Sequence, residues 1–406
     1  MGTAKIGSIP GGTVTSPEGF YAGATYAGIK KKAEHSLDLG SLFSEAPCVA
    51  TALFTTHKIK SAPVVLCQER LREGRAAAVV ANSGCANAST GEQGLADAAE
   101  MTVLAADGIG VSPEDVLVAS TGVIGQPLPM KLIRAAVSQI IISKDGGHEL
   151  AKAIMTTDTV PKETAVAIRF GNSKFTIGGV AKGSGMIHPE LATMFCFLTT
   201  DAAVELGFLK SALQKAVDVS FNMISVDGDT SPSDMVLIMA NGLAGNEPIS
   251  SGSQQAETFQ QALDQVCIYL AKAIARDGEG ATKLIEVTVN GAISATEARL
   301  AARTIVSSLL VKAAVHGADP NWGRIIAAVG RSGVEVVESK IDLHIGDVSV
   351  VKGGISLPFS EQSVIRVLKQ SEVPISVHLN LGIASATAWG CDLSEEYVTI
   401  NSQYMT

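Results

Sequence analysis

The sequence predicts a layered α/β protein, and three features of its 406 residues lead to that class. Short apolar segments alternate with segments whose apolar residues have helical spacing. Hydrophobic residues make up 46% of the chain, enough for a sizeable core, whereas charged residues make up only 17%. The 40 glycines favour many tight backbone turns. At roughly 100–200 residues per domain, the chain has two or three domains.

The first half of the chain alternates between strand and helix patterns. Buried strands are predicted at residues 64–66, 76–80 and 116–119, where short apolar runs end in polar turns. Helices are predicted at residues 95–106 and 130–142, where apolar residues recur every three or four positions. This alternation is typical of a layered α/β core.

The second half begins with a linker at residues 247–255 and a helix over 259–274, which Gly278 ends. Residues 285–289 alternate as a strand into the Asn290-Gly291 pair, a hairpin or turn signal. Ser294 and Glu297 have capping-box spacing and open a helix to about residue 315. From residue 334 onward the pattern alternates again, which predicts a smaller α+β C-terminal domain.

Charge and cysteine content exclude several classes of protein. The net charge is −9 without a basic stripe, so we expect neither nucleic acid nor an anionic membrane as a partner. The longest stretch without acidic or basic residues, 373–391, contains Pro374 and His378 and fails as a membrane span. The start of the chain lacks the apolar run of a signal peptide.

The six cysteines are scattered and lack metal-ligand spacing. They predict reduced, mostly buried thiols, no metal site and a cytoplasmic protein.

The most informative segment is residues 182–202. A glycine-rich stretch and Pro189 precede the Ala192-Thr193 pair, and an apolar run that must be buried follows it. Thr193 therefore lies where a loop meets a core strand, a suitable place for a nucleophile. The alternative is that Thr193 is an ordinary β-branched strand residue, and spacing alone favours that alternative.

This segment resembles the self-cleavage site of the ornithine acetyltransferase family, the bifunctional glutamate/ornithine N-acetyltransferases of arginine biosynthesis. The resemblance covers nearly the whole chain. The other matching stretches are residues 82–87, 120–125, 156–159, 225–230, 275–283, 319–324 and 401–404. Each stretch is weak evidence by itself, but together and in family order they are highly specific.

The resemblance implies a layered α/β sandwich of the self-cleaving N-terminal-nucleophile type. It implies cleavage between Ala192 and Thr193 into an α chain, residues 1–192, and a β chain, residues 193–406. Residues 193–284 would complete the core domain with the α chain, and residues 285–406 would form the C-terminal domain. Two copies of each chain would associate as an α2β2 heterotetramer. The freed α-amino group of Thr193 has an ordinary pKa near 7.7–8.0, so it can act as the base for its own hydroxyl.

The same resemblance assigns roles to individual residues. Thr121, through its hydroxyl, and Gly122, through its backbone N–H, would form the oxyanion hole. The substrate-binding positions would be Thr156, Lys182, Thr193, Glu279, Asn401 and Thr406. Thr157 and Thr159 are close alternatives to Thr156. The chain departs from the family pattern at Pro232-Ser233, where the proline can alter substrate access, and at Met405-Thr406. Asp227 and Asp229 lie close together in a turn, where we interpret them as capping residues and assign no metal.

The implied activity is transfer of the acetyl group from N-acetylornithine to glutamate through an acetyl-Thr193 intermediate, without a cofactor. Acetyl-CoA is a candidate second donor, and the sequence does not decide whether it is used. One alternative is an N-terminal-nucleophile aminopeptidase or amidohydrolase of related fold, in which water replaces glutamate. Another is an uncleaved, non-catalytic protein that binds an amino acid in the same pocket.

Overall fold

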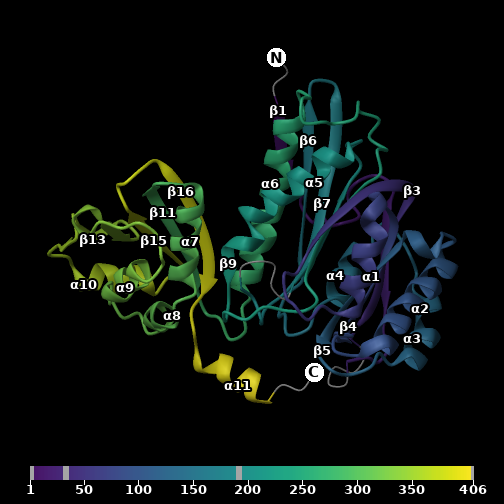
Figure 1. The fold of residues 1–406 in the computed structure, drawn as a ribbon, viewed down its shortest axis with the longest axis horizontal. Helices are drawn as coiled ribbons and strands as arrows, with labels where there is room; N and C mark the ends of the chain where they lie inside the picture. Colours follow the sequence, from purple (N-terminus) through teal and green to yellow (C-terminus); the bar gives the residue numbers. More distant parts are fainter. Residues whose placement is uncertain (1–3, 31–35, 189–193, 404–406) are drawn as a thin grey trace.

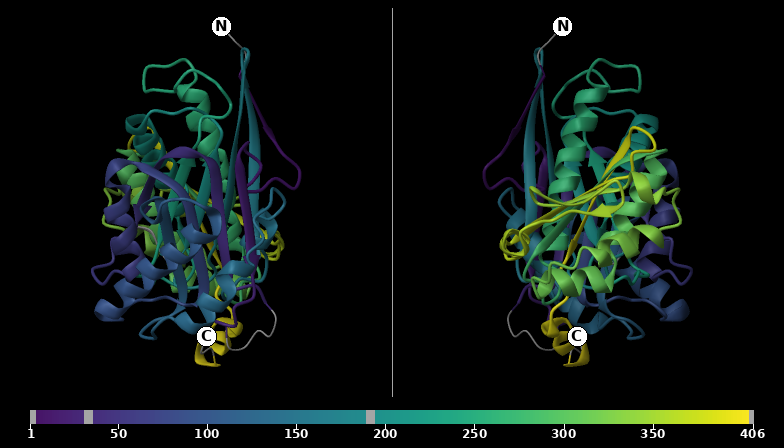
Figure 2. Two further views of the ribbon diagram at one scale, coloured as in Figure 1. Left: turned by 90° about the vertical axis from the view of Figure 1, so that its right-hand side faces the viewer. Right: turned by 90° about the vertical axis from the view of Figure 1, so that its left-hand side faces the viewer.

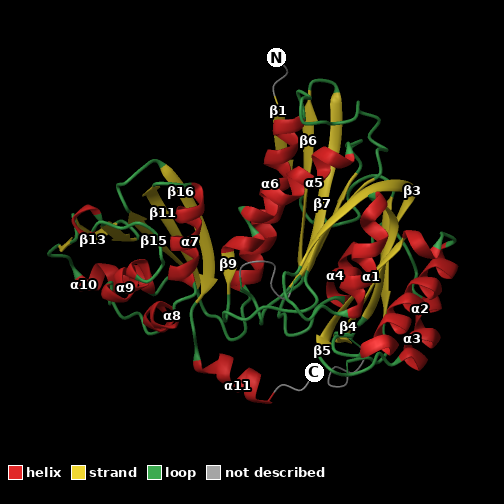
Figure 3. Ribbon diagram, in the orientation of Figure 1, coloured by secondary structure: helices red, strands yellow, loops and turns green. Residues whose placement is uncertain are grey.

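The computed structural model describes residues 4–30, 36–188 and 194–403, and the statements below concern these residues. Two β-sheets lie side by side, each with helices packed on it (Figure 1). Helices and strands are mixed in both parts (Figure 3), so the predicted α/β class is confirmed. Within the described ranges, no helix is both long and apolar enough to cross a membrane.

The first sheet has nine strands in the described part of the chain. Eight of them follow the order β1-β6-β7-β8-β10-β3-β4-β5, and β2 pairs with β3 outside this path. Two neighbouring pairs are parallel, β8 with β10 and β4 with β5. The strands are β1 Ala4–Ser8, β2 Phe20–Thr25, β3 Leu39–Phe54, β4 Arg75–Cys85, β5 Val116–Val123, β6 Lys162–Phe170, β7 Ser173–Lys182, β8 Phe195–Thr200 and β10 Met235–Ala240.

Helices cover both faces of this sheet, so its central strands are apolar on both sides. In β8, Phe195 and Phe197 belong to one core while Cys196 and Leu198 belong to the other, because alternate side chains of a strand point to opposite faces. Side views show helices on either side of the strands (Figure 2). The helices of this part are α1 Ala62–Arg70, α2 Gly91–Ile109, α3 Met130–Ala136, α4 Gly147–Ala153, α5 Leu206–Asp218 and α6 Ala256–Arg276.

The second sheet has seven described strands in the order β14-β13-β12-β15-β11-β16-β9. Its strands are β9 Ile224–Ser225, β11 Leu284–Ala292, β12 Asp342–Ile345, β13 Val348–Lys352, β14 Ile355–Ser356, β15 Glu372–His378 and β16 Ala384–Cys391. Its helices are α7 Ala295–Val306, α8 Leu309–His316, α9 Gly323–Gly330 and α10 Glu361–Leu368. Helix α7 packs on β11 and β16, and one hydrophobic core continues from this part to α5 and α6. After β16, α11 Glu395–Gln403 extends below the second sheet towards the first (Figure 1).

The strands that precede and follow position 193 are interleaved in the first sheet. β8 and β10 come after that position, yet they lie between β7 and β3, which come before it. β7 pairs with β8 over six residues and β10 pairs with β3 over six more. Each half of the chain therefore supplies strands to one shared sheet.

Three sequence predictions need correction, and a fourth, the helix to residue 315, is two helices, as described below. Residues 64–66 belong to α1 instead of a strand, since Val64 and Cys67 are buried while Val65 is 42% exposed, a helical period. The helix predicted to residue 142 ends at Ala136, and a short 3-10 turn follows it. Asn290 and Gly291 lie inside β11, where Gly291 has a φ of +70° and the register with β16 shifts, so this pair marks a bulge.

Other predicted features are present. Ser294 caps α7 by accepting a hydrogen bond from the Glu297 amide, 3.2 Å away. The predicted helix to residue 315 divides in two, because Ser308 caps a second helix, α8. All six cysteines are buried and free, as predicted.

Candidate functional site

The site begins where β4 and β5 end side by side. These strands run parallel, with Ser83 opposite Thr121 and Gly84 opposite Gly122. Gly122 has a φ of +127°, and a Cβ there would lie 2.3 Å from the carbonyl carbon of Gly84. Only glycine fits that position, because a side chain there would overlap the backbone of β4. Thr121 is 3% exposed beside it.

A buried ammonium group lies against Thr121. Lys182 is the last residue of β7 and is 2% exposed. Its Nζ donates to Thr156 Oγ1 at 2.8 Å and to Thr121 Oγ1 at 3.5 Å. The lysine thus joins two hydroxyl side chains that lie 35 positions apart in the chain.

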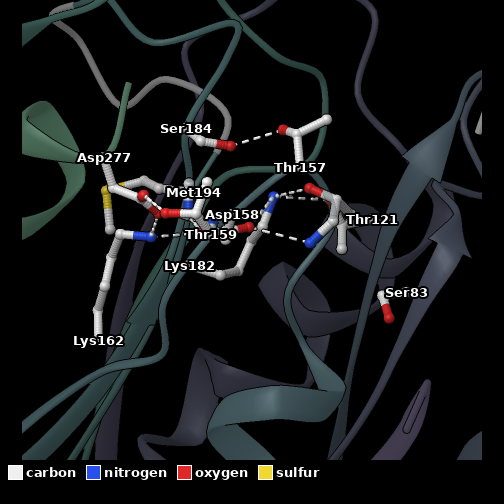
Figure 4. A network of polar contacts seen from close by, with 12 residues as sticks. Ser83, Thr121, Thr157, Asp158, Thr159, Lys162, Lys182, Ser184, Met194 and Asp277 are labelled. Atoms are coloured by element: carbon white, nitrogen blue, oxygen red, sulfur yellow. Dashed lines mark hydrogen bonds and ion pairs between the residues drawn. The ribbon is translucent and has the colours of Figure 1, made fainter. Parts of the chain in front are cut away.

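Asp158 connects Lys182 to a second buried lysine (Figure 4). Its Oδ1 accepts from Lys162 Nζ at 2.7 Å and from the Gly183 amide at 2.7 Å. Its Oδ2 accepts from the Thr156 amide at 2.9 Å and lies 4.0 Å from Lys182 Nζ. Asp158 therefore holds the Lys182 ammonium group in place and also the backbone of Thr156, whose hydroxyl accepts from that ammonium group.

The electrostatics of this network follow from burial and charge. Burial by itself would raise the pKa of Asp158, but the ammonium groups of Lys182 and Lys162 outweigh it and hold that pKa below its usual range. Burial lowers the pKa of Lys182, and the Asp158 carboxylate opposes that shift. The two charges stabilise each other in a site from which water is largely excluded.

We expect Asp158→Asn to lower the free energy of unfolding by about 3–5 kcal/mol at pH 7, because it leaves the buried Lys182 ammonium without its carboxylate, whereas Lys162 keeps Asp277 at 2.6 Å. A carboxyl whose pKa is lower in the folded chain contributes stability above its unfolded pKa, near 3.9, and loses it as the pH falls further. The difference between wild type and variant should hold at about pH 5–7 and narrow below about pH 4. Urea unfolding across this range measures it.

The control for this prediction is Glu100→Gln. Glu100 pairs with Arg134 at the surface, and exposed ion pairs contribute roughly 0–1 kcal/mol. An Asp158→Asn protein as stable as the control at pH 7 would contradict the role given to the buried network.

The opposite wall of the site carries a carboxylate. Glu279 follows α6 in a turn, and its amide donates to the Ser184 carbonyl at 2.9 Å. Its Oε2 accepts from Asn401 Nδ2 of α11 at 2.7 Å. A Cβ on Gly185 would lie 2.4 Å from the Glu279 carboxylate carbon, so glycine is what allows this close approach.

These groups enclose one pocket of about 180 Å³. Its lining comes from both halves of the chain and from α11. The lining residues are Ala86, Thr121, Gly122, Ile124, Thr156, Thr157, Lys182, Gly185, Met186, Ser231, Pro232, Ser233, Glu279 and Asn401. A larger cavity of about 680 Å³ beside α6 is lined by Thr159, the alternative to Thr156, but by none of the other predicted site residues. Within the described residues, no three His, Cys, Asp or Glu side chains are arranged to hold a metal ion.

The structure brings together most of the residues singled out in the sequence. Thr121, Gly122, Thr156, Lys182, Glu279 and Asn401 all line this pocket. Ala192, Thr193 and Thr406 lie outside the described residues. Of the alternatives to Thr156, Thr157 lines the pocket and its Oγ1 is 2.5 Å from Ser184 Oγ, whereas Thr159 contacts Asp277 elsewhere. The roles of these residues stay predictions.

Two carboxylates near the pocket have structural duties. The sequence gives no sign of the importance of Asp158, although it lies inside the 156–159 stretch, because that importance depends on its contacts with two lysines.

Asp227 accepts hydrogen bonds from the amides of Met186 and Ile187 at 2.6 and 2.9 Å and so caps the loop at these residues. This agrees with its interpretation as a capping residue.

Comparisons with known proteins agree on one family. The model of the ArgJ family matches residues 21–406. The arginine biosynthesis bifunctional protein ArgJ of Dehalococcoides mccartyi is 52% identical over 403 residues, which cover 99% of this chain and all of that protein.

Two solved structures are also similar to the chain. One is arginine biosynthesis bifunctional protein ArgJ from Bacillus halodurans, 48% identical with a TM-score of 0.50; the match covers 52% of this chain and 98% of the solved chain. The other is an ornithine acetyltransferase complexed with ornithine from Mycobacterium tuberculosis, 39% identical with a TM-score of 0.42; it covers 47% of this chain and all of the solved chain. The chain belongs to the ArgJ family, whose curated members are named bifunctional proteins of arginine biosynthesis.

Proposed function

We propose that the chain is an acetyltransferase of arginine biosynthesis that moves the acetyl group of N-acetylornithine to glutamate through an ester on Thr193. The observation that carries the proposal is the pocket itself. It places a hydroxyl, a glycine N–H, a buried ammonium and a carboxylate around one small space. N-acetylornithine presents complementary groups, namely an acetyl carbonyl oxygen, a carboxylate and a cationic side-chain amine. Membership of the ArgJ family supports the same activity.

The end of β5 supplies the oxyanion hole in this proposal. When an oxygen nucleophile attacks the acetyl carbon, negative charge develops on the carbonyl oxygen. The Thr121 hydroxyl and the Gly122 N–H lie on adjacent residues and would donate to that oxygen. Donors held in place before the reaction are typically worth about 3–4 kcal/mol each, because they need no reorganisation.

The reaction then has two steps, acetylation of Thr193 and transfer of the acetyl group to glutamate. The Thr193 Oγ attacks the acetyl carbon, its proton passes through the Thr193 α-amine to the leaving nitrogen, and the C–N bond to ornithine breaks. The amine of glutamate next attacks the ester, its proton returns to Oγ, and N-acetylglutamate leaves. Lys182, buried near the site, would keep the Thr193 amine neutral, since a nearby positive charge lowers the pKa of an amine.

Glu279 is the receptor we propose for the cationic side chain of ornithine. Its carboxylate lines the pocket and is oriented by Asn401. We expect Gly185→Ala to displace this carboxylate without unfolding the protein, because the clash is with the flexible end of a side chain. The KM for N-acetylornithine should rise about 10- to 100-fold, the value of a hydrogen bond between charged groups, with kcat little changed. A kinetic comparison with wild type measures this, and an unchanged KM would contradict it.

We also propose that the chain cleaves itself between Ala192 and Thr193. The solved B. halodurans chain supports this, because it is matched over 98% of its own length and yet covers only 52% of this chain, as expected of one of two fragments of similar size. The interleaving of β7, β8, β10 and β3 would hold the two fragments together. The resulting α2β2 assembly would have a mass near twice 41.9 kDa and would work in the cytoplasm.

The experiment that tests the proposed function uses the purified protein with N-acetylornithine, with and without glutamate. Mass spectrometry should show ornithine and N-acetylglutamate in equal amounts, and only a small burst of ornithine when glutamate is absent. Continuous release of acetate at a rate independent of glutamate would contradict the proposal and favour a hydrolase. Replacing N-acetylornithine by acetyl-CoA in a parallel reaction tests the second donor.

A further inference from the structure

A fully buried carboxyl group lies beside the start of β8. Asp234 precedes β10, and its side chain is 0% exposed. Its Oδ1 accepts a hydrogen bond from the Met194 amide at 2.8 Å. Because β8 and β10 run parallel with Phe195 opposite Met235, Met194 and Asp234 are neighbours at the same end of the sheet. In addition, the Met235 amide donates a hydrogen bond to the Met194 carbonyl at 3.2 Å.

The second oxygen of this carboxyl makes no hydrogen bond of normal geometry with the described residues. Asp234 Oδ2 is buried and has no hydrogen-bond partner among the described residues. Burial raises the pKa of Asp234 well above its usual range, against the opposing effects of the Met194 amide, the Lys182 ammonium and the nearby Ser231. A buried polar group with unused hydrogen-bonding capacity costs free energy, so the place of this carboxyl beside the start of β8 needs an explanation.

The other end of β8 provides the contrast. Asp201 follows that strand and is 6% exposed. Both of its oxygens are used, because Oδ1 accepts from the Thr176 amide at 2.6 Å and Oδ2 from the Glu18 amide at 3.1 Å. Two buried carboxyls therefore bracket the same strand, and only the one beside Met194 leaves an oxygen without a described partner.

We propose that Asp234 is a positioning residue for Thr193: by holding the Met194 amide, it fixes the end of β8 that follows Thr193 in the chain. The proposal rests on the proposed function, in which Thr193 is the nucleophile. After cleavage Thr193 would be the first residue of a chain, and chain ends are poorly ordered unless they are tied down. The Met194 amide is the first described backbone group after the nucleophile, and a misplacement of about 1 Å can cost roughly 100-fold in rate.

The test compares Asp234→Ala and Asp234→Asn with the control Asp201→Ala. Rates are normalised to cleaved protein measured by mass spectrometry. We expect Asp234→Ala to lower kcat for acetyl transfer about 100-fold with KM within a few-fold of wild type. Asp234→Asn should restore kcat to within a few-fold, since its amide oxygen accepts the same N–H. Asp201→Ala should lower the midpoint of thermal unfolding but leave kcat unchanged.

A second measurement does not depend on activity. Hydrogen exchange at the Met194 amide should be faster in Asp234→Ala and near the wild-type rate in Asp234→Asn. Wild-type kcat in Asp234→Ala would overturn the proposal, as would an Asp234→Asn protein as slow as Asp234→Ala. A wild-type protein that transfers no acetyl group counts against the proposed function instead, and the exchange rates then still decide whether Asp234 holds Met194.

Discussion

A Thr193→Ala protein should remain one chain of 41.9 kDa and should transfer no acetyl group at a measurable rate. Both effects have one cause in the proposed mechanism, because the same hydroxyl attacks the preceding carbonyl during cleavage and the acetyl carbon during turnover. Denaturing mass spectrometry reads the first effect, and the N-acetylornithine assay with glutamate reads the second. The loss should exceed that of any other substitution discussed.

Thr193→Ser is the matched control. Serine keeps the hydroxyl but loses the methyl group that restricts its rotation. The Thr193→Ser protein should therefore cleave and transfer acetyl groups more slowly than wild type, but at rates well above those of Thr193→Ala. A Thr193→Ala protein that is cut, or an uncut protein with full activity, would show that Thr193 is not the nucleophile.

The second large effect is expected for Thr121→Ala. Removing this hydroxyl deletes one proposed oxyanion donor and little volume, so kcat should fall about 100- to 1,000-fold, equivalent to roughly 2.7–4 kcal/mol. KM should change little, since the donor acts mainly in the transition state. The structure adds one expectation: Lys182 Nζ loses a contact at 3.5 Å but keeps Thr156 at 2.8 Å, so the fold should survive.

Thr121→Ser tests the chemistry of the hydroxyl and should keep much of the rate, although the oxygen is less rigidly held. All rates are compared per cleaved molecule, because the same donor can assist cleavage. If cleaved Thr121→Ala works within a few-fold of wild type, the Gly122 N–H would be the only oxyanion donor left.

Much of the site could be predicted because its residues lie in distinctive stretches of sequence. Gly122, Lys182 and Glu279 were all assigned from such stretches, and each lines the pocket. Asp158 was missed because its meaning depends on Lys162 and Lys182, whose approach is created by the sheet. Asp234 was missed for a similar reason, since its contact with Met194 spans 40 positions of the chain.

The errors in secondary structure have a local cause. The three apolar residues 64–66 are too few to distinguish a period of 2 from a period of 3.6, and only the exposure of Val65 decides. The Asn290-Gly291 pair correctly indicates a residue with positive φ, but such a pair does not distinguish a turn that ends a strand from a bulge within it. Both distinctions depend on tertiary packing.

The interleaved strands of the first sheet have a consequence for the life of the molecule. Before cleavage, β7, β8, β10 and β3 belong to one polypeptide, so their pairing does not depend on protein concentration. If the chain is cut as proposed, the same ladder would join two molecules, and its re-formation from unfolded fragments would become a second-order reaction that slows with dilution. The uncut chain would then fold readily, whereas the separated fragments would refold poorly. The lifetime of the cut protein would therefore be set by its rate of unfolding.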